Sequence, residues 1–386
     1  MDSNKTENTF QRIIKSGAVR MMVAVVLVAI IVGVVGVIRN PAEISFAPDS
    51  FEQTSPEIPQ LSAGTPHGQI AVDYVYTLNS DFFGRFPLSY REMDTAAWLV
   101  EVLLAMGYTW DDISVQEFTV EDTLHLAYDV FGEEIGFLVD LLYLFCSSPF
   151  VNFEARESRQ SQNVILTVPG QSNEVMVVGA HYDAFMYPGA SDNASGVALL
   201  LESAQRMREL DNYYTIIYVF FGAEEAGLLG SIYYVNSLTQ EQHDNILFMI
   251  NADVLLEGPD LFYMAGYVRD NTRGENHITQ TWDYIAQNVE TQHGITITAL
   301  PDGVLGPSDQ LAFLLFEHTA MFLAGLDKNE YFYRYGMDAF SSMTRVLHSP
   351  RDCFYYINER WPGKIDDNMR GFSLLLEEFL LADYYY

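Results

Sequence analysis

Five residues of this chain have the side-chain chemistry of zinc ligands, and each stands in a short, distinct motif. They are His181 in GAHYD, Asp192 in GASDNASG, Glu225 in FGAEEAGLLGS, Asp253 in INADV and His348 in VLHSPRD. Zinc binds imidazole nitrogen and carboxylate oxygen, and a catalytic zinc leaves one position open for water. Two histidines and three carboxylates can supply a histidine and a carboxylate to each of two ions, with one further carboxylate bridging them. The set predicts two zinc ions per chain.

A sixth residue, Glu224, directly precedes Glu225 and has the chemistry of a general base. Two metals about 3.5–4 Å apart can hold water as a nucleophile and polarise the carbonyl group that it attacks. A free carboxylate must then take the proton of the water and give it to the leaving amine. Successive side chains at a strand end point in different directions, so Glu225 can bind metal while Glu224 faces the substrate. The pair predicts a hydrolase.

The composition indicates a large and acidic folded domain. The chain has 386 residues, 49% of them hydrophobic, and 52 acidic against 20 basic residues give a formal net charge of −32. This length is long for one domain on the usual prior. Nucleic acid requires a basic surface, so we expect no nucleic-acid partner. Peptide substrates with a free, positively charged α-amine would be attracted instead.

An apolar segment near the N-terminus, Met21 to Ile38, predicts a transmembrane anchor. All of its residues are apolar or Gly, and it reaches the roughly 18 residues that mark a spanning helix. A cleaved signal peptide is the alternative, although its apolar core is usually shorter and no A-x-A-like cleavage site follows. The positive-inside rule places residues 1–20 in the cytoplasm and the catalytic domain outside the cell, because four basic residues precede the segment: Lys5, Arg12, Lys15 and Arg20.

The rest of the chain divides into a linker and one folded domain. Residues 39–66 are rich in Pro, Ser, Thr and acids, a composition that resists packing. The domain, residues 67–386, contains every expected ligand and is interrupted by an insertion at about 119–153. A helix at 134–145 of this insertion either covers the catalytic face as a lid or packs in the core. Together with 305–308 and 331–340, the insertion is expected to form the walls of the substrate pocket.

Strand and helix patterns alternate along this domain. Such alternation indicates an α/β fold, with a mixed, mainly parallel central sheet and helices on both faces. Pro169 and Gly170, between the first two strands, predict a hairpin at the sheet edge. Three ligands follow strand ends, where open α/β sheets place their sites. The expected strands are 163–168, 174–179, 214–220, 246–251 and 319–324, and the expected helices are 71–78, 94–107, 196–210, 227–237, 277–291 and 369–384.

From Asn163 to Val254, and again around His348, the sequence resembles the co-catalytic di-zinc aminopeptidases of clan MH. This family includes bacterial leucyl aminopeptidases, glutamate carboxypeptidases, glutaminyl cyclases and the transferrin receptor ectodomain. The resemblance covers roughly residues 67–386 and implies a zinc exopeptidase-like fold.

The resemblance also implies a role for each site residue. His181 and Asp253 would hold one zinc ion, Glu225 and His348 the other, and Asp192 would bridge the two. Glu224 would be the general acid/base. Asp183 would bind the other ring nitrogen of His181 and so fix its tautomer.

Three smaller features follow from the same resemblance. A cis peptide bond is expected between Asp192 and Asn193, and Gly189 and Gly196 would let this loop approach the metal closely. The Gly84–Arg85 pair matches a Gly-Arg pair that relatives carry ahead of the metal core. Many relatives have Ser-Asp-His where this chain has Ser308, Asp309 and Gln310. Because none of these three is an expected ligand, the departure affects a substrate contact and not the metal set.

The best interpretation is a membrane-anchored, extracellular, zinc-dependent aminopeptidase acting on peptides. A glutaminyl cyclase-like aminoacyltransferase would use one zinc, whereas five ligands favour two. A carboxypeptidase would need a basic pocket, and Lys and Arg are scarce. A receptor-like ectodomain would have lost ligands, and none is lost here. Cobalt or manganese could also bind such donors. Cys146 and Cys353 are expected to be free thiols. The sequence does not predict the oligomeric state.

Overall fold

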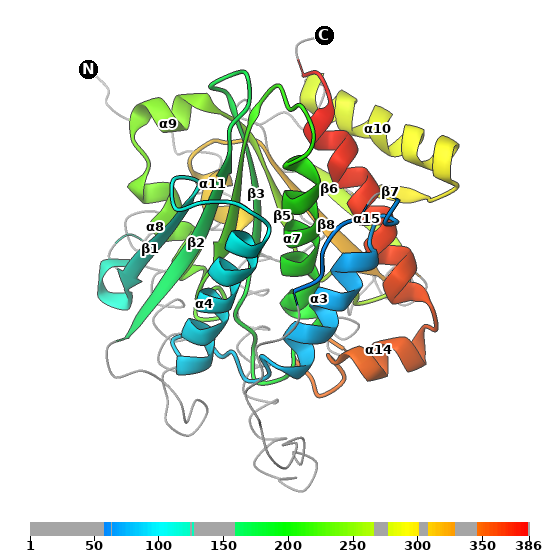
Figure 1. The fold of residues 1–386 in the computed structure, drawn as a ribbon, viewed down its shortest axis with the longest axis horizontal. Helices are drawn as coiled ribbons and strands as arrows, with labels where there is room; N and C mark the ends of the chain where they lie inside the picture. The colour runs from blue at the N-terminus through cyan, green and yellow to red at the C-terminus, as the bar shows by residue number, and fades with distance from the viewer. Residues whose placement is uncertain are drawn as a thin grey trace, which may run out of the picture. The chain divides into compact units, whose positions relative to one another are not determined.

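An eight-stranded mixed sheet forms the centre of the protein (Figure 1). The computed structural model describes residues 58–62, 64–123, 126, 159–265, 277–300, 308–328 and 346–384, all of which belong to one unit, Pro56–Tyr386. In these ranges no helix is long and apolar enough to span a membrane. Several predicted features lie outside the described residues: the anchor at 21–38, most of the linker, the insertion from 127 to 153 with its lid helix, the pocket walls at 305–307 and 331–340, and Cys146.

The strand order is β1-β2-β4-β3-β5-β8-β6-β7. The four central strands, β4, β3, β5 and β8, run parallel to one another, whereas β1 and β2 on one side and β6 on the other pair with antiparallel neighbours. The prediction of a mixed sheet with a parallel centre is therefore confirmed. The strands are β1 Ile113–Thr119, β2 Gln160–Val168, β3 Val175–His181, β4 Thr215–Phe221, β5 Ile246–Ala252, β6 Asp260–Ala265, β7 Ile297–Leu300 and β8 Ala320–Leu326.

The predicted hairpin between β2 and β3 is wrong. Strand β4 lies between them, antiparallel to β2 and parallel to β3. The connecting turn crosses the start of β4, because a Cβ on Gly170 would lie 2.3 Å from the Tyr214 carbonyl carbon. Pro169 and Gly170 do mark a turn, but a local turn signal cannot show that a later strand inserts between its two neighbours.

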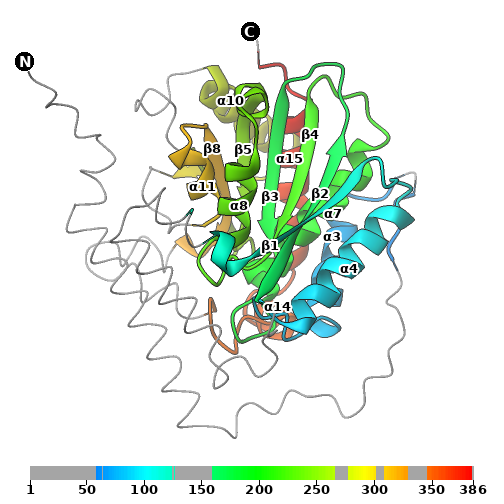
Figure 2. The ribbon, with the colours of Figure 1, turned by 90° about the vertical axis from the view of Figure 1, so that its left-hand side faces the viewer.

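Helices cover both faces of the sheet, as predicted (Figure 2). Alternate side chains of β3 define the two layers: Met176 and Val178 pack in the core that contains α7, whereas Val177 packs in the core that contains α8 and α11. The first layer comprises α3 Gln69–Ser80, α4 Tyr90–Ala105, α7 Ser195–Met207, α10 His277–His293 and α15 Lys364–Leu381, and the second comprises α8 Leu229–Ser237 and α11 Gln310–Leu315. Two shorter helices are α9 Gln240–Asn245 and α14 Phe354–Arg360.

One buried carboxylate, Glu202 on α7, joins three helices of the first layer. It accepts the backbone N–H groups of Gly68 (2.7 Å) and Ala71 (2.9 Å), which leaves fewer unpaired donors at the start of α3. It also accepts the hydroxyl of Ser373 on α15 and Nε of Arg206. Helix α3 has no side-chain cap of its own, so Glu202 caps it from a neighbouring helix.

Candidate metal centre

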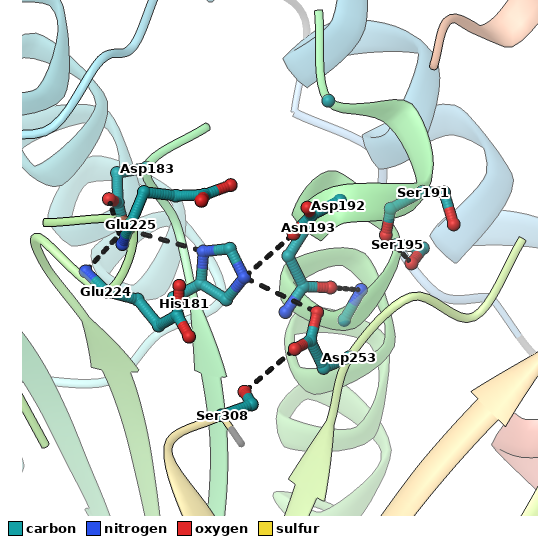
Figure 3. Close-up of polar contacts among 12 residues, drawn as sticks. His181, Asp183, Ser191, Asp192, Asn193, Ser195, Glu224, Glu225, Asp253 and Ser308 are labelled. Carbon is teal, nitrogen blue, oxygen red and sulfur yellow. Dashed lines mark hydrogen bonds and ion pairs between the residues drawn. The ribbon is translucent and has the colours of Figure 1, made fainter. Parts of the chain in front are cut away.

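Three neighbouring strands, β4, β3 and β5, end at one edge of the sheet and deliver site residues there (Figure 3). His181 is the last residue of β3, Asp253 directly follows β5, and Glu225 follows β4 in the next loop. Ala223 and Val254 have left-handed backbone conformations, with φ of 53° and 52°. These conformations are uncommon outside Gly, and they turn the chain sharply beside Glu224 and Asp253.

The structure brings all five expected ligands together. His181 Nε2 lies 3.0 Å from Asp192 Oδ1 and 3.4 Å from Asp253 Oδ1. His348 Nε2 lies 3.0 Å from Asp192 Oδ2 and 3.2 Å from Glu225 Oε2. Each trio has ligand atoms within 4.8 Å of one another, and Asp192 belongs to both. Its two oxygens face different histidines, which is the placement expected of a bridge.

The donor set fits zinc chemically. Three nearly buried carboxylates converge on two imidazoles, and burying ionised carboxylates is costly unless a cation compensates their charge. Burial raises the pKa of Glu225 to about 7, despite the opposing attraction of His348. Asp253 Oδ1 accepts no hydrogen bond from the described residues. Nitrogen and oxygen donors with this unbalanced charge suit divalent zinc.

The two histidines and Asp192 are strongly polarised. Burial opposes ionisation of Asp192, but hydrogen bonds from His181 and His348 outweigh it and lower the carboxyl pKa. Burial lowers the pKa of both imidazoles, but the attraction of nearby carboxylates outweighs burial, so the net pKa of each ring is raised. The carboxylates are Glu224 and Asp253 at His181, and Glu225 and Asp192 at His348. The first imidazole is 1% exposed and the second 40%, so the His348 side of the centre faces solvent.

Asp192 lies in a tightly packed turn between β3 and α7. The peptide bond from Asp192 to Asn193 is cis, as expected. The Asn193 amide donates to the Ala252 carbonyl and accepts the Gly196 N–H, both at 2.9 Å. A Cβ on Gly196 would lie 2.1 Å from the Ala252 oxygen, and Gly189 has φ of 62°. Gly196 therefore permits a close approach of this turn to Ala252, and Gly189 permits the left-handed backbone conformation. A close approach of the loop to metal stays a prediction.

Asp183 contacts both sides of the centre. Its Oδ1 lies 3.4 Å from His181 Nδ1, longer than a normal hydrogen bond. The same carboxylate accepts the backbone N–H groups of Glu224 and Glu225, each at 3.1 Å. The sequence predicted only the contact with His181, but Asp183 also fixes the backbone that carries the two glutamates.

Glu224 and Glu225 leave the chain side by side, and their carboxyl groups point in different directions (Figure 3). Burial raises the pKa of the Glu224 carboxyl well above its ordinary value. Attraction to His181 opposes the rise, and repulsion from neighbouring carboxylates adds to it. A carboxyl group with a raised pKa can both accept and return a proton near neutral pH, as the expected general acid/base must.

The segment that departs from the family pattern positions Asp253. The Ser308 hydroxyl donates to Asp253 Oδ2 at 2.8 Å. Asn251 donates to Ser308 Oγ and to Gln310 Oε1, both at 2.9 Å. Gln310 therefore holds the Asn251 side-chain amide, which in turn orients Ser308. Burial raises the pKa of the neighbouring Asp309 to about 7, against the attraction of His181.

Sequence reasoning missed a group of buried charged residues that bind the backbone of the site loops. Each acts on a peptide group beside an expected ligand or beside Glu224. The only signals in the sequence were the Gly84–Arg85 pair and the last residue of VLHSPRD. The group consists of Arg85, Glu92, Glu257 and Asp352, with Glu92 accepting the N–H of Ala223 at 2.8 Å and Glu257 that of Leu347 at 2.9 Å.

Residues 163–373 match the model of peptidase family M28. This match spans more than half of the chain. The chain belongs to peptidase family M28. An aminopeptidase of Pseudomonas aeruginosa is 38% identical over 102 residues, which are 26% of this chain and 19% of that protein. Aminopeptidase YwaD of Bacillus subtilis is 34% identical over 109 residues, 27% of this chain and 24% of that protein. The chain thus spans less than a third of these relatives' length.

Solved structures share the fold over most of their length. The Bacillus subtilis zinc aminopeptidase BSAP has a TM-score of 0.59 at 16% identity, covering 86% of this chain and 98% of that one. The Bacteroides thetaiotaomicron glutaminyl cyclase has a TM-score of 0.57 at 17% identity, covering 85% of this chain and 100% of that one. Because these identities are low, the likeness concerns the fold alone.

Proposed function

We propose that this chain is a di-zinc aminopeptidase that releases N-terminal residues from peptides. The observation that carries the proposal is the position of Asp192, with one carboxylate oxygen 3.0 Å from each histidine. A bridging carboxylate between two His-containing trios suits a pair of ions better than one. The aminopeptidase names of the similar bacterial proteins support the same activity.

Each residue of the centre has a role in this proposal. His181 and Asp253 would hold one ion, Glu225 and His348 would hold the other, and Asp192 would bind both. Zinc bound at these donors would polarise the scissile carbonyl and lower the pKa of the attacking water towards neutrality.

Glu224 takes a proton from the water during attack and gives it to the leaving amine. The Asp183 carboxylate keeps the Glu224 backbone in place by accepting the Glu224 N–H.

The use of Arg85 supports an aminopeptidase over a carboxypeptidase. A carboxypeptidase needs a cation for the substrate carboxylate. Among the described residues, Arg85 is the one buried Arg or Lys, and its guanidinium donates to backbone carbonyls. A substrate amine, in contrast, suits an acidic centre.

Hydrolysis of leucyl-anilide tests the proposal directly. We expect cleavage of the free amine substrate, no cleavage of its N-acetylated form, and loss of activity in chelator with recovery on adding zinc. Zinc analysis should give two ions per chain. Cleavage that prefers a free carboxylate over a free amine would contradict the proposal.

A glutaminyl cyclase is the second candidate, because a solved cyclase shares this fold. It would release ammonia from a peptide with N-terminal glutamine and leave the peptide bonds intact. The same peptide therefore separates the two activities: an aminopeptidase releases free glutamine, and a cyclase leaves a blocked peptide of full length.

We propose further that residues 21–38 anchor the protein in the cell membrane, with the catalytic domain outside. The apolar composition of the segment and the basic residues before it support this orientation. Protease added to intact cells should remove the domain, and N-terminal sequencing of the membrane-bound protein should find the segment retained. A mature protein that begins after residue 38 would indicate a cleaved signal peptide instead.

A further inference from the structure

A buried arginine, Arg85, holds the loop that connects His181 to Asp192. Its Nε donates to the Tyr182 carbonyl at 2.8 Å, Nη1 to Pro188 at 2.6 Å and Nη2 to Gly189 at 2.7 Å. Tyr182 follows His181 in the chain, and Gly189 lies just before the turn of Asp192. One guanidinium therefore binds both ends of the loop.

The backbone of Arg85 adds a further contact, since its carbonyl accepts the N–H of Ala184 at 3.0 Å. The fit at the far end of the loop is close. A Cβ on Gly189 would lie 2.9 Å from Arg85 Nη2 and 2.3 Å from the Asp192 carbonyl oxygen. The loop and the arginine are thus packed so closely that there is no space for even one methyl group between them.

Asp352 holds the same loop at its Asp192 end. Its Oδ1 accepts the N–H of Ser191 at 2.6 Å, and Oδ2 accepts the N–H of Asp192 at 3.1 Å. Asp352 lies four residues after His348, so it also joins the segment of the second histidine to the bridging residue. Both Asp352 and Arg85 are buried.

We propose that Arg85 and Asp352 are positioning residues that clamp the loop from Tyr182 to Asp192 and thereby set the zinc affinity of the centre. This inference rests on the proposed zinc site. Neither residue is expected to touch metal or substrate. The clamp fixes the separation of His181 from Asp192, and partners of this kind, which orient ligands, typically contribute about 10–100-fold in metal affinity.

The fork of Arg85 is the feature to test, because lysine keeps the charge but has one compact ammonium in place of a planar set of donors. Arg206 is a matched control. It donates from Nη2 to the carbonyls of Thr65 (3.2 Å) and Pro66 (2.8 Å) and from Nε to Glu202, within the first helical layer. Arg206→Lys removes the same kind of fork outside the metal centre.

The experiment compares Arg85→Lys, Arg206→Lys and the unsubstituted full-length chain. Zinc affinity is measured by competition with a chelating dye, and the melting temperature of the metal-free protein is measured in parallel. We expect Arg85→Lys to weaken zinc binding about 10–100-fold and Arg206→Lys to leave it within twofold. Equal zinc affinities for the two variants, at similar losses of melting temperature, would overturn the clamp.

Asp352→Asn provides the second arm and carries the test if Arg85→Lys does not fold. Asparagine keeps one acceptor but turns an N–H₂ group towards the other backbone N–H. Glu202→Gln is its control, since Glu202 also accepts two backbone N–H groups, those of Gly68 and Ala71. We expect weaker zinc binding for Asp352→Asn alone, and unchanged affinity would contradict the clamp.

Kinetics separate this inference from the proposed activity. At saturating zinc, Arg85→Lys should keep the KM for leucyl-anilide within about twofold while the zinc concentration needed for half-activity rises with the measured affinity loss. If the unsubstituted protein binds zinc but cleaves no anilide, the proposed activity fails while the affinity comparison still decides the clamp. If it binds no zinc, both fail.

Discussion

At the scale of single residues, two adjacent glutamates differ in function because they face different partners. Glu225 Oε2 lies 3.2 Å from His348, inside one ligand trio. Glu224 belongs to neither trio, and burial among carboxylates raises its pKa. The backbone N–H groups of both are held by Asp183, so their divergence is built into the loop.

Replacing Glu224 by glutamine should abolish proton transfer and leave the metal in place. We expect kcat for leucyl-anilide to fall by about 10²–10⁴-fold, the usual contribution of a general acid/base. Zinc content should be unchanged, since Glu224 is not an expected ligand. Stopped assays at saturating substrate, with metal analysis of the same samples, measure both quantities.

Glu225→Gln is the matched comparison for that prediction. It changes the neighbouring residue in the same way but removes a donor from one trio, so it should lower zinc content as well as activity. The two assignments would be reversed if Glu224→Gln lost zinc and Glu225→Gln kept it.

Zinc binding should depend on pH through the two histidines. Carboxylates raise the pKa of His181 and His348 well above the ordinary value, so the metal-free centre favours the protonated form of both rings. Zinc requires neutral imidazole and must displace those protons. We expect affinity to rise steadily from pH 6 to pH 8 and calorimetry in buffers of different ionisation enthalpy to detect proton release. A zinc affinity that does not change between pH 6 and pH 8 would contradict the raised pKa of the two histidines.

At the scale of elements, the sequence was sufficient where a side chain pattern repeats within one segment. Period-two and period-3.6 patterns located the central strands and most helices, and the ligands fell at strand ends because parallel strands finish at one edge. The order of strands was not predictable in the same way. The insertion of β4 between β2 and β3 depends on pairing across the sheet, which the Pro169–Gly170 turn does not encode.

The buried charges around the site were missed for a related reason. Arg85, Glu92 and Asp352 bind backbone groups of loops that lie far away in sequence. A backbone N–H or carbonyl is present at nearly every residue, so its partner leaves no pattern to read. The expected ligands, in contrast, were recognisable because zinc demands particular side chains.

Glu202 provides a prediction for the first helical layer. Glu202→Ala leaves two backbone N–H groups at the start of α3 and the Arg206 head without their buried acceptor. We expect the free energy of unfolding to fall by roughly 3–5 kcal/mol, as for other broken buried pairs. Denaturant unfolding of the metal-free protein measures the change.

Glu241→Ala on α9 is the control for Glu202→Ala, because its side chain is exposed. It should alter stability by no more than about 0.5 kcal/mol. Similar losses for the two substitutions would show that Glu202 does not join the helices as its contacts indicate.

At the scale of the whole molecule, acidity combines with burial. The chain carries a formal net charge of −32, and several acids are buried around the centre. Burial raises the pKa of Asp352 to about 8 and that of Asp309 and Glu225 to about 7. In an unfolded chain these groups would titrate near pH 4. Over roughly pH 4–8 the folded state therefore binds more protons than the unfolded state.

The metal-free protein should consequently lose stability as pH rises. A folded state that binds extra protons becomes less stable with increasing pH. The raised pKa of the two ligand histidines acts in the same direction. Their contribution is complete below the unfolded-state pKa of about 6.5 and is lost progressively as pH rises through the higher folded-state pKa. In chelator, the melting temperature should be higher at pH 5 than at pH 8, and the opposite order would contradict the pKa shifts.

Zinc should reverse that trend, which provides the internal control. Metal binds the deprotonated donors, so its stabilisation grows with pH and with free zinc concentration. We expect the increase in melting temperature on adding zinc to be larger at pH 8 than at pH 5. An equal increase in melting temperature at pH 5 and pH 8 would indicate that zinc binds away from these titrating groups.

The guanidinium of Arg85 belongs to a part of the chain that precedes the family-matched residues 163–373. A shortened protein beginning at β2 would retain all five expected zinc donors and Glu224, yet its loop from Tyr182 to Gly189 would have three carbonyls without their buried donor. Homology over the donor-bearing half therefore underestimates the minimal working unit. Any recombinant or circularly permuted version must therefore include the N-terminal helices α3 and α4 with Arg85 between them, as well as the ligand histidines.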